Sequence, residues 1–319
     1  NVLNIARYPT YQVFLVMVSA LVAAGVLFPL WIKLLRFRNI GQQVRADGPQ
    51  GHLVKQGTPT MGGVLILLVV SAVYVVSGRF DRQSALVLGT MLACGILGFV
   101  DDYAKVVKER SLGLSPRAKI LSQAAVAITL GLLAVNWGGL SAHATIPLVG
   151  RYLDLGVFVS HFGVGGFDIA VPWLYILLVV IMVTSASNTV NLTDGLDGLA
   201  AGTVTIVTFA YAAIAFRQNH LEVALLAGAI AGSCIGFLWY NSYPADIFMG
   251  DTGSLVLGPA LAALAVVTKT ELLPPLLRAR SVVPARPLIC QGCALHPPGP
   301  RAPRLPPSPR TSPPRCGLS

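Results

Sequence analysis

The sequence predicts an all-α polytopic membrane protein with about eight transmembrane helices. Hydrophobic residues make up 54% of the 319 residues and charged residues only 11%, whereas soluble domains carry roughly 25% charged residues. The apolar residues gather in eight stretches, and the acidic residues lie between these stretches or at their ends. Water is a poor solvent for such a chain, so we expect a lipid bilayer to surround most of it.

Each apolar stretch is expected to form one helix, because lipid offers the backbone N–H and C=O groups no partner except each other. Several stretches are shorter than the ~20 residues that span a bilayer, so the helices should extend into the flanking segments. The first stretch lacks a small-residue cleavage site and is interpreted as a membrane helix, not a signal peptide. The long connection Asn136–Ala170 alternates loosely and is expected to hold a short hairpin. The stretches are Val13–Ile32, Met61–Val76, Ser84–Val100, Ile120–Val135, Val171–Thr189, Leu199–Phe216, Leu221–Trp239 and Gly253–Val267.

Basic residues in the loops predict the orientation of the bundle, because Lys and Arg are enriched on the cytoplasmic side. The loops after the first and third stretches carry ten basic residues, and the segments on the opposite side carry five. The loops after the odd-numbered stretches are therefore expected in the cytoplasm, with the N-terminus outside. The ten are Lys33, Arg36, Arg38, Arg45, Lys55, Lys105, Lys108, Arg110, Arg117 and Lys119; the five are Arg7, Arg79, Arg82, Arg151 and Arg217.

The same alternation places most carboxylates on the predicted cytoplasmic face. Clustered carboxylates repel one another unless a cation or a proton is shared among them. We therefore expect a cation-dependent site at that face. Eight of the 13 acidic residues lie there, namely Asp47, Asp101, Asp102, Glu109, Asp194, Asp197, Asp246 and Asp251.

Three of these carboxylates stand directly at predicted helix ends. Asp101 and Asp102 follow the third stretch, where they suit general-base work or a magnesium-bound phosphate substrate. A solvated helix end beside Lys105 is the alternative. Asp251 lies just before the eighth stretch, where it is interpreted as a Mg²⁺ ligand beside a helix N-terminus that attracts phosphate. It could also cap that helix.

Amide and carboxylate side chains end the fifth stretch with helical spacing. Asn188 and Asn191 are three residues apart, as are Asp194 and Asp197, so each pair shares a helix face. The glycine after each aspartate lets a ligand approach the backbone closely. This density of polar groups suits a sugar nucleotide better than a protein core, while a Gly-Asp turn is the alternative.

A glycine-rich segment with Lys55 before it opens the second stretch. Gly57–Gly63 is similar to a phosphate-binding loop, but it lacks the Gly-Lys-Ser/Thr order of a P-loop. The alternative is a capped helix start whose glycines permit close packing.

Together these segments resemble the phospho-N-acetylmuramoyl-pentapeptide-transferase family, within the polyprenyl-phosphate N-acetylhexosamine-1-phosphate transferase superfamily. The resemblance implies an enzyme that transfers phospho-N-acetylmuramoyl-pentapeptide from its UDP carrier to undecaprenyl phosphate. Lipid I and UMP would be the products of this first membrane step of peptidoglycan synthesis. It also implies Mg²⁺ as cofactor, the bacterial inner membrane as location, a cytoplasmic active site and a homodimer. The matching segments are Gly41–Gly63, Asp101-Asp102, Asn188–Gly198 and Met249–Ser254, which occur in the family order.

By this resemblance, Asp101, Asp102 and Asp251 are the expected catalytic residues. Asp251 would hold Mg²⁺ on the diphosphate. Asp101 and Asp102 would deprotonate or orient the lipid phosphate, and the resemblance does not assign these two roles between the two residues. The expected substrate-binding residues are Lys55, Thr60, Lys119, Asn188, Asn191, Asp194, Asp197, Asn241 and Phe248.

The chain departs from the family pattern after residue 272. The family continues with two more membrane helices, ten in all, and a cytoplasmic loop with a histidine cluster. Residues 273–319 instead hold 13 prolines, seven arginines and one histidine, a composition typical of disorder. We expect residues 1–272 to form the transferase core and the printed chain to be nearly inactive. A basic tail on the membrane surface is the alternative.

Other classes of protein fit the sequence less well. A sister enzyme that moves N-acetylglucosamine-1-phosphate to the same lipid shares the aspartate motifs but not the Gly57–Gly63 pattern. A transporter would place charges at mid-membrane, whereas these carboxylates stand at helix ends. An inactive truncated or frameshifted copy is the third alternative. The net charge of +10 gives no support to a nucleic-acid partner, because seven of the 23 basic residues follow residue 273.

Overall fold

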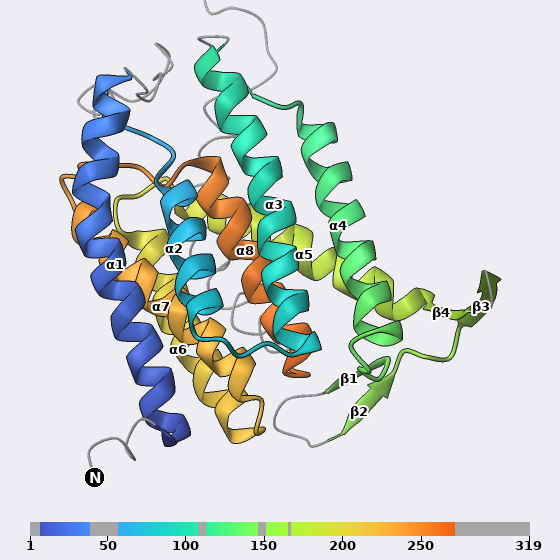
Figure 1. Ribbon diagram of the computed structural model, residues 1–319. Coiled ribbons are helices and arrows are strands. Elements are labelled where there is room, and N and C mark those ends of the chain that lie inside the picture. The colour runs from blue at the N-terminus through green and yellow to red at the C-terminus, as the bar shows by residue number, and fades with distance from the viewer. Residues whose placement is uncertain (1–6, 39–56, 108–112, 146–150, 165–166, 272–319) are drawn as a thin grey trace, which may run out of the picture. The chain divides into compact units, whose positions relative to one another are not determined.

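The computed structural model describes residues 7–38, 57–107, 113–145, 151–164 and 167–271, and the helices in this part of the chain form one bundle (Figure 1). The predicted all-α membrane architecture is confirmed. Seven of these helices are long and apolar enough to cross a bilayer, and α2 is shorter at 15 residues. The predicted tail, residues 273–319, lies outside the described residues. The helices are α1 Pro9–Phe37, α2 Gly62–Val76, α3 Arg82–Val107, α4 Pro116–Asn136, α5 Trp173–Thr193, α6 Leu199–Arg217, α7 Leu221–Asn241 and α8 Gly250–Val267.

Two helices extend further toward the carboxylates than the apolar pattern predicts. α3 continues seven residues past the predicted end at Val100, and α8 begins three residues before Gly253. One stabilising contact in the added turns of α3 joins Lys105 to Asp101, four residues earlier, at 2.8 Å. Asp101, Asp102 and Asp251 therefore lie inside helices, which fixes their backbone positions.

The two most buried helices are α7 and α8. α8 packs against α2, α3, α5 and α6, while α7 packs against α1, α2 and α6. α1 covers the outside of the bundle, and its Phe14, Val26 and Leu30 side chains are more than half exposed. Because α1 is long enough to span a membrane, we expect these exposed apolar side chains to contact lipid.

The start of α2 and the start of α8 approach each other closely because both carry glycine. A Cβ atom on Gly63 would lie 2.0 Å from the backbone nitrogen of Gly253. The backbone N–H groups of Gly62 and Gly63 donate to the carbonyl oxygens of Phe248 and Met249, at 2.9 and 2.8 Å. This contact joins the Gly57–Gly63 segment to the N-terminus of α8.

Two small antiparallel hairpins fill the connection between α4 and α5, where the sequence predicts one. β1, His143–Thr145, pairs with β2, Tyr152–Asp154, and β3, Val159–Val164, pairs with β4, Phe167–Pro172. The Asn136 side chain, at the end of α4, both donates to and accepts from the backbone of Ala170, at 2.9 Å each. These two hydrogen bonds hold the second hairpin to the end of α4.

A buried ion pair closes the other end of α8, far along the helix from Asp251. The Lys269 ammonium contacts the Glu271 carboxylate at 3.2 Å and donates to the Tyr175 hydroxyl at 3.0 Å and to the Ser141 carbonyl at 2.5 Å. Glu271 is fully buried. Burial lowers the pKa of Lys269 and raises that of Glu271, and the opposite charge of the partner counteracts each shift. Loss of either side chain would therefore leave the other charge buried without its partner.

We expect Lys269→Met to destabilise the protein by about 3 kcal/mol, because it leaves Glu271 buried without its counter-charge. The measurement is the thermal unfolding midpoint in detergent. Lys33→Met is the control, because Lys33 is exposed on α1. Equal midpoints for the two variants would contradict a stabilising role for the pair.

Candidate active site

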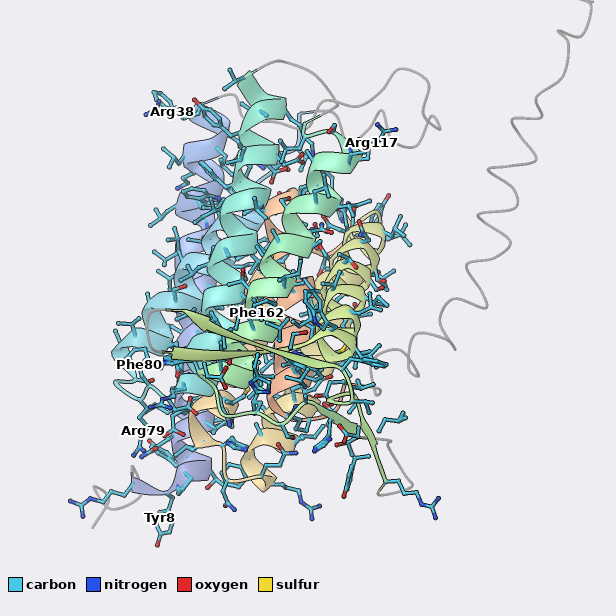
Figure 2. All side chains as sticks on the ribbon, turned by 90° about the vertical axis from the view of Figure 1, so that its right-hand side faces the viewer. Tyr8, Arg38, Arg79, Phe80, Arg117 and Phe162 are labelled. Atoms are coloured by element: carbon cyan, nitrogen blue, oxygen red, sulfur yellow. The ribbon has the colours of Figure 1, made fainter. Side chains whose placement is uncertain are left out.

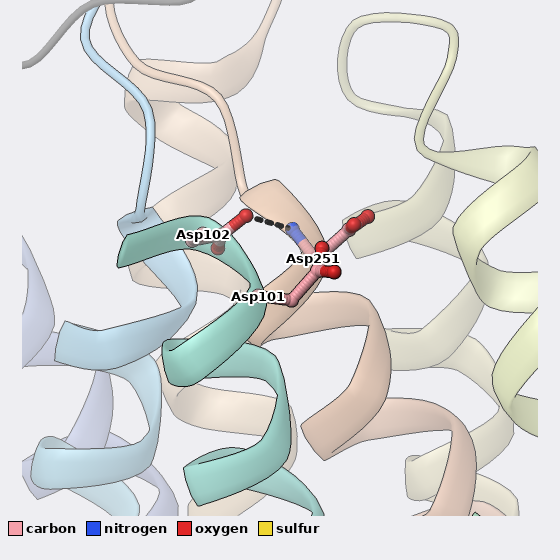
Figure 3. Close-up of side chains that lie close together, drawn as sticks. All are labelled: Asp101, Asp102 and Asp251. Carbon is pink, nitrogen blue, oxygen red and sulfur yellow. Dashed lines mark hydrogen bonds between the residues drawn. The ribbon is translucent and has the colours of Figure 1, made fainter. Parts of the chain in front are cut away.

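Three carboxylates from two helices meet at one end of the bundle. Asp101 and Asp102 project from the last two turns of α3, and Asp251 projects from the first turn of α8 (Figure 3). One oxygen from each carboxylate lies within 4.8 Å of the others. Asp101 and Asp102 are almost fully buried, at 1% and 4% exposure. Such proximity of negative groups requires cations or protons among them.

Asp102 caps the N-terminus of α8 from a different helix. Its Oδ1 accepts from the backbone N–H of Asp251 at 3.1 Å, shown in Figure 3, and its Oδ2 accepts from the N–H of Thr252 at 2.8 Å. The Thr252 hydroxyl also donates to Oδ2, at 2.7 Å. The alternative that Asp251 caps α8 is wrong, because Met249 holds the N-cap position without a side-chain cap bond. Asp102 satisfies free N–H groups of the first turn and thereby positions Asp251.

Asp101 keeps one oxygen for the shared site. Its Oδ1 accepts from the backbone N–H of Leu114 at 2.6 Å, in the segment that leads into α4. Its Oδ2 faces the ammonium groups of Lys105 and Lys119, at 2.8 and 3.2 Å. Asp101 therefore differs from its neighbour Asp102, whose two oxygens are both engaged by α8.

Two lysines supply positive charge to the cluster. Lys119, from the first turn of α4, contacts Asp251 Oδ2 at 2.7 Å. Lys105 also donates to Asp251 Oδ2, and it lies 3.7 Å from Asp102 Oδ1. Three carboxylates and two ammonium groups leave one net negative charge. The sequence predicted Lys119 for this site but treated Lys105 only as a neighbour. The signal for Lys105 was its spacing of three and four residues from the aspartates, which places all three side chains on one helix face.

Asp194 brings a fourth carboxyl group toward the start of α8. It is the C-cap residue of α5 and is half-buried. Withdrawal from water, together with the negative charges of Asp251, Asp102 and Asp197, raises the pKa of Asp194 to about 8, against a hydrogen bond from the Gly250 N–H that lowers it. A carboxyl group with this pKa is mostly protonated at pH 7, and it can both donate and accept hydrogen bonds.

Asn241 joins two loops beside the site. It is buried, its amide donates to the Ile247 carbonyl at 2.9 Å, and its oxygen accepts from the Gly198 N–H at 3.0 Å. The sequence predicts that Asn241 lines a nucleotide pocket. The structure shows its amide engaged with the backbone of the loops after α5 and α7, and the pocket role stays a prediction.

The other expected substrate-binding residues take varied positions. The Asn191 oxygen accepts from the Ser254 hydroxyl of α8 at 3.2 Å, whereas Asn188 is exposed and donates to Thr184 within its own helix. Thr60 lies beside Gly250, because a Cβ on that glycine would be 3.1 Å from the Thr60 hydroxyl. The backbone N–H of Phe248 donates to the Pro59 carbonyl at 2.8 Å. Lys55 lies outside the described residues.

The donor set fits a hard divalent cation. Mg²⁺ prefers oxygen ligands at about 2.1 Å, commonly one or two carboxylates together with substrate phosphates. Asp101, Asp102 and Asp251 each offer one oxygen, and these oxygens all lie within 4.8 Å of one another. The flanking lysines suit the phosphate groups of a substrate.

The bundle is that of an integral membrane protein, and the comparisons with known families place it among transferases. Consistent with that class, the family model described as glycosyl transferase family 4 matches residues 84–269. A second model, described as phospho-N-acetylmuramoyl-pentapeptide-transferase signature 1, matches residues 55–67, the segment that packs against the start of α8.

Curated relatives narrow the class further. A phospho-N-acetylmuramoyl-pentapeptide-transferase of Halalkalibacterium halodurans is 43% identical over 263 residues, which cover 81% of this chain and 76% of the relative. Those of Frankia casuarinae and Rubrobacter xylanophilus are 45% and 42% identical, over 81% and 87% of this chain and 77% and 82% of the relatives. The chain belongs to the phospho-N-acetylmuramoyl-pentapeptide-transferase family, and the expectation from its motifs is confirmed.

Proposed function

We propose that the protein transfers phospho-N-acetylmuramoyl-pentapeptide from its UDP carrier to undecaprenyl phosphate. An oxygen of the lipid phosphate attacks the sugar-linked phosphorus of the nucleotide, the bond to the UMP oxygen breaks, and lipid I and UMP form. The observation that supports this proposal is the group of Asp101 and Asp251 oxygens held between Lys105 and Lys119 at one end of a membrane bundle. There, a water-soluble nucleotide and a membrane-embedded phosphate can meet.

The residues have distinct roles in this proposal. Asp251, with Asp101 beside it, would hold Mg²⁺, which neutralises charge on the reacting phosphates when it is bound. Asp101 is the better placed of the aspartate pair to orient or deprotonate the lipid phosphate, because both Asp102 oxygens accept from α8. Lys105 and Lys119 offset the negative charge that opposes attack of one phosphate on another. Asn191, Asp194 and Asp197 would contact the nucleotide.

UMP release from purified protein in detergent tests the reaction. UDP-N-acetylmuramoyl-pentapeptide and UDP-N-acetylglucosamine are compared as donors, with undecaprenyl phosphate and Mg²⁺ present. Because residues 273–319 depart from the family pattern, the assay includes a chimera in which a curated relative supplies the sequence after residue 271. We expect release only from the muramoyl donor. Release only from the N-acetylglucosamine donor would favour the sister enzyme, and no release by the chimera from either donor would contradict the proposal.

We also propose that the carboxylate end of the bundle faces the cytoplasm of a bacterium. Arg38 and Arg117 lie at one end of the bundle, while Tyr8 and Arg79 lie at the other (Figure 2). The excess of basic residues belongs to the loops at the first end.

Cysteine labelling of cells tests this orientation. Single cysteines at Thr193 and Ser242 should react only with a reagent that crosses the inner membrane, and cysteines at Arg79 and Arg151 should react from outside. Cys94 and Cys234 are buried, and Cys290, Cys293 and Cys316 are first replaced by serine. Labelling of Thr193 and Ser242 from opposite sides would contradict the topology.

A further inference from the structure

Lys105 occupies the centre of the carboxylate cluster. Its ammonium lies 2.8 Å from Asp101 Oδ2 and 3.7 Å from Asp102 Oδ1, and it donates to Asp251 Oδ2. Lys119 contacts two of the three carboxylates. Among the described residues, Lys105 is therefore the cation whose position comes nearest to that of an ion shared by all three aspartates.

A divalent cation would need the same oxygen atoms. Metal–oxygen bonds of about 2.1 Å require the carboxylate lone pairs that now accept from the ammonium, and two cations at one point repel each other. Without any cation, the three carboxylates would repel one another and separate. The Lys105 ammonium thus offsets the repulsion among the three carboxylates, as a bound metal ion would.

We propose that Lys105 is a resident counter-ion, which holds the three carboxylates together before Mg²⁺ binds and leaves Asp101 and Asp251 when it does. This inference rests on the proposed function. Displaced from the carboxylates, the ammonium is free to turn toward the phosphate groups of the nucleotide. Lys119 stays as the second counter-charge, so the net charge of the three carboxylates and their bound cations changes from −1 to 0 as Mg²⁺ replaces the ammonium.

Two features of Lys105 make this exchange feasible. Its side chain is 29% exposed, whereas those of Asp101 and Asp102 are 1% and 5% exposed, so the ammonium has a way out that the carboxylates lack. It also ends a flexible chain of four methylene groups, whose rotation moves the charge without moving α3. Asp102 accepts three hydrogen bonds from α8, and these keep α3 and α8 together during the exchange.

The exchange makes Lys105 a competitor for metal binding, and this consequence can be measured without substrate. Binding of Mn²⁺ to the purified full chain in detergent is followed by the electron paramagnetic resonance signal of free Mn²⁺, with Mg²⁺ as competitor. We expect Lys105→Met to bind Mn²⁺ about tenfold more tightly than the unchanged protein. Arg117→Met removes the same charge from an exposed position at the same end and should change the affinity less than twofold.

A second measurement needs no variant. Acetylation of lysines by an amine reagent, located by mass spectrometry, should increase at Lys105 when Mg²⁺ is added, because the ammonium is released from the carboxylates. Lys33, exposed on α1, should react equally with and without Mg²⁺.

The outcomes separate this inference from the proposed function. Unchanged or weaker Mn²⁺ binding by folded Lys105→Met would overturn the counter-ion role, as would Lys105 acetylation that does not respond to Mg²⁺. If Lys105→Met does not fold, Lys105→Gln, which keeps most of the side-chain length without the charge, and the acetylation experiment decide. Failure of the unchanged protein to bind Mn²⁺ at a saturable site would instead overturn the metal site of the proposed function.

Discussion

Asp251→Ala is expected to lower UMP release on the order of 1,000-fold while the protein stays folded. Asp251 presents one oxygen to Lys105, Lys119 and the site shared with Asp101. No other carboxylate extends from the first turn of α8, so the loss cannot be replaced locally. The backbone of α8 keeps its cap from Asp102, whose contacts involve the Asp251 N–H and not its side chain. Folding should therefore survive.

The measurement compares UMP release by the chimera with and without the substitution, at equal folded concentration. Asp246→Ala is the matched control, because Asp246 precedes the same helix and its side chain is 63% exposed beside Arg36. We expect the control to retain activity within twofold, since an exposed ion pair contributes little. Near-normal Mg²⁺-dependent turnover by Asp251→Ala would show that the metal assignment is wrong.

Gly63→Ala is expected to prevent assembly of the site by separating α2 from α8. The added methyl group would lie 2.0 and 2.1 Å from backbone atoms of Gly253, and backbone cannot turn away as a flexible side chain can. Relief of the overlap would break the hydrogen bonds from Gly62 and Gly63 to the residues before α8. Overpacking of this kind costs about 3 kcal/mol or more, a large part of the stability of a typical domain.

Thermal unfolding and the monodisperse fraction in detergent measure this effect. Gly89→Ala on α3 is the control, because nothing lies within 4 Å of the added methyl group and alanine favours a helix by about 1 kcal/mol. We expect the control to match or exceed the unchanged protein, while Gly63→Ala loses folded protein and Mn²⁺ binding together. A Gly63→Ala protein with an unchanged unfolding midpoint would contradict the close contact.

The site depends on groups that are far apart in the sequence. Asp102 lies 149 residues before the Asp251 backbone N–H that it accepts from, and Lys105 lies 146 residues before the Asp251 side chain. A substitution at Asp102 would therefore disturb both the charge of the cluster and the start of α8. Metal affinity and thermal stability should be measured together for any variant of this residue.

The sequence by itself determined the eight helices and the end of the bundle at which Asp101, Asp102 and Asp251 meet. A long apolar segment forms a helix in lipid, because its backbone N–H and C=O groups must hydrogen-bond to one another there. Alternation of spans then brings the odd-numbered connections to one end. The motifs were sufficient to indicate the family, which the curated relatives confirm. The order of chain elements was thus enough to predict where these three carboxylates meet, without any knowledge of packing.

Only the tertiary structure decided which groups each of these side chains contacts. The local sequence does not predict how each helix is rotated or which helices it contacts. Both follow from close packing at small residues such as Gly63 and Gly253. That packing makes Asp102 the cap of α8 and directs Asn241 to loop backbone. It also places Lys105 among three carboxylates. Hydrogen bonds and ion pairs form over about 3 Å, and such distances between distant segments are fixed only when the helices have packed.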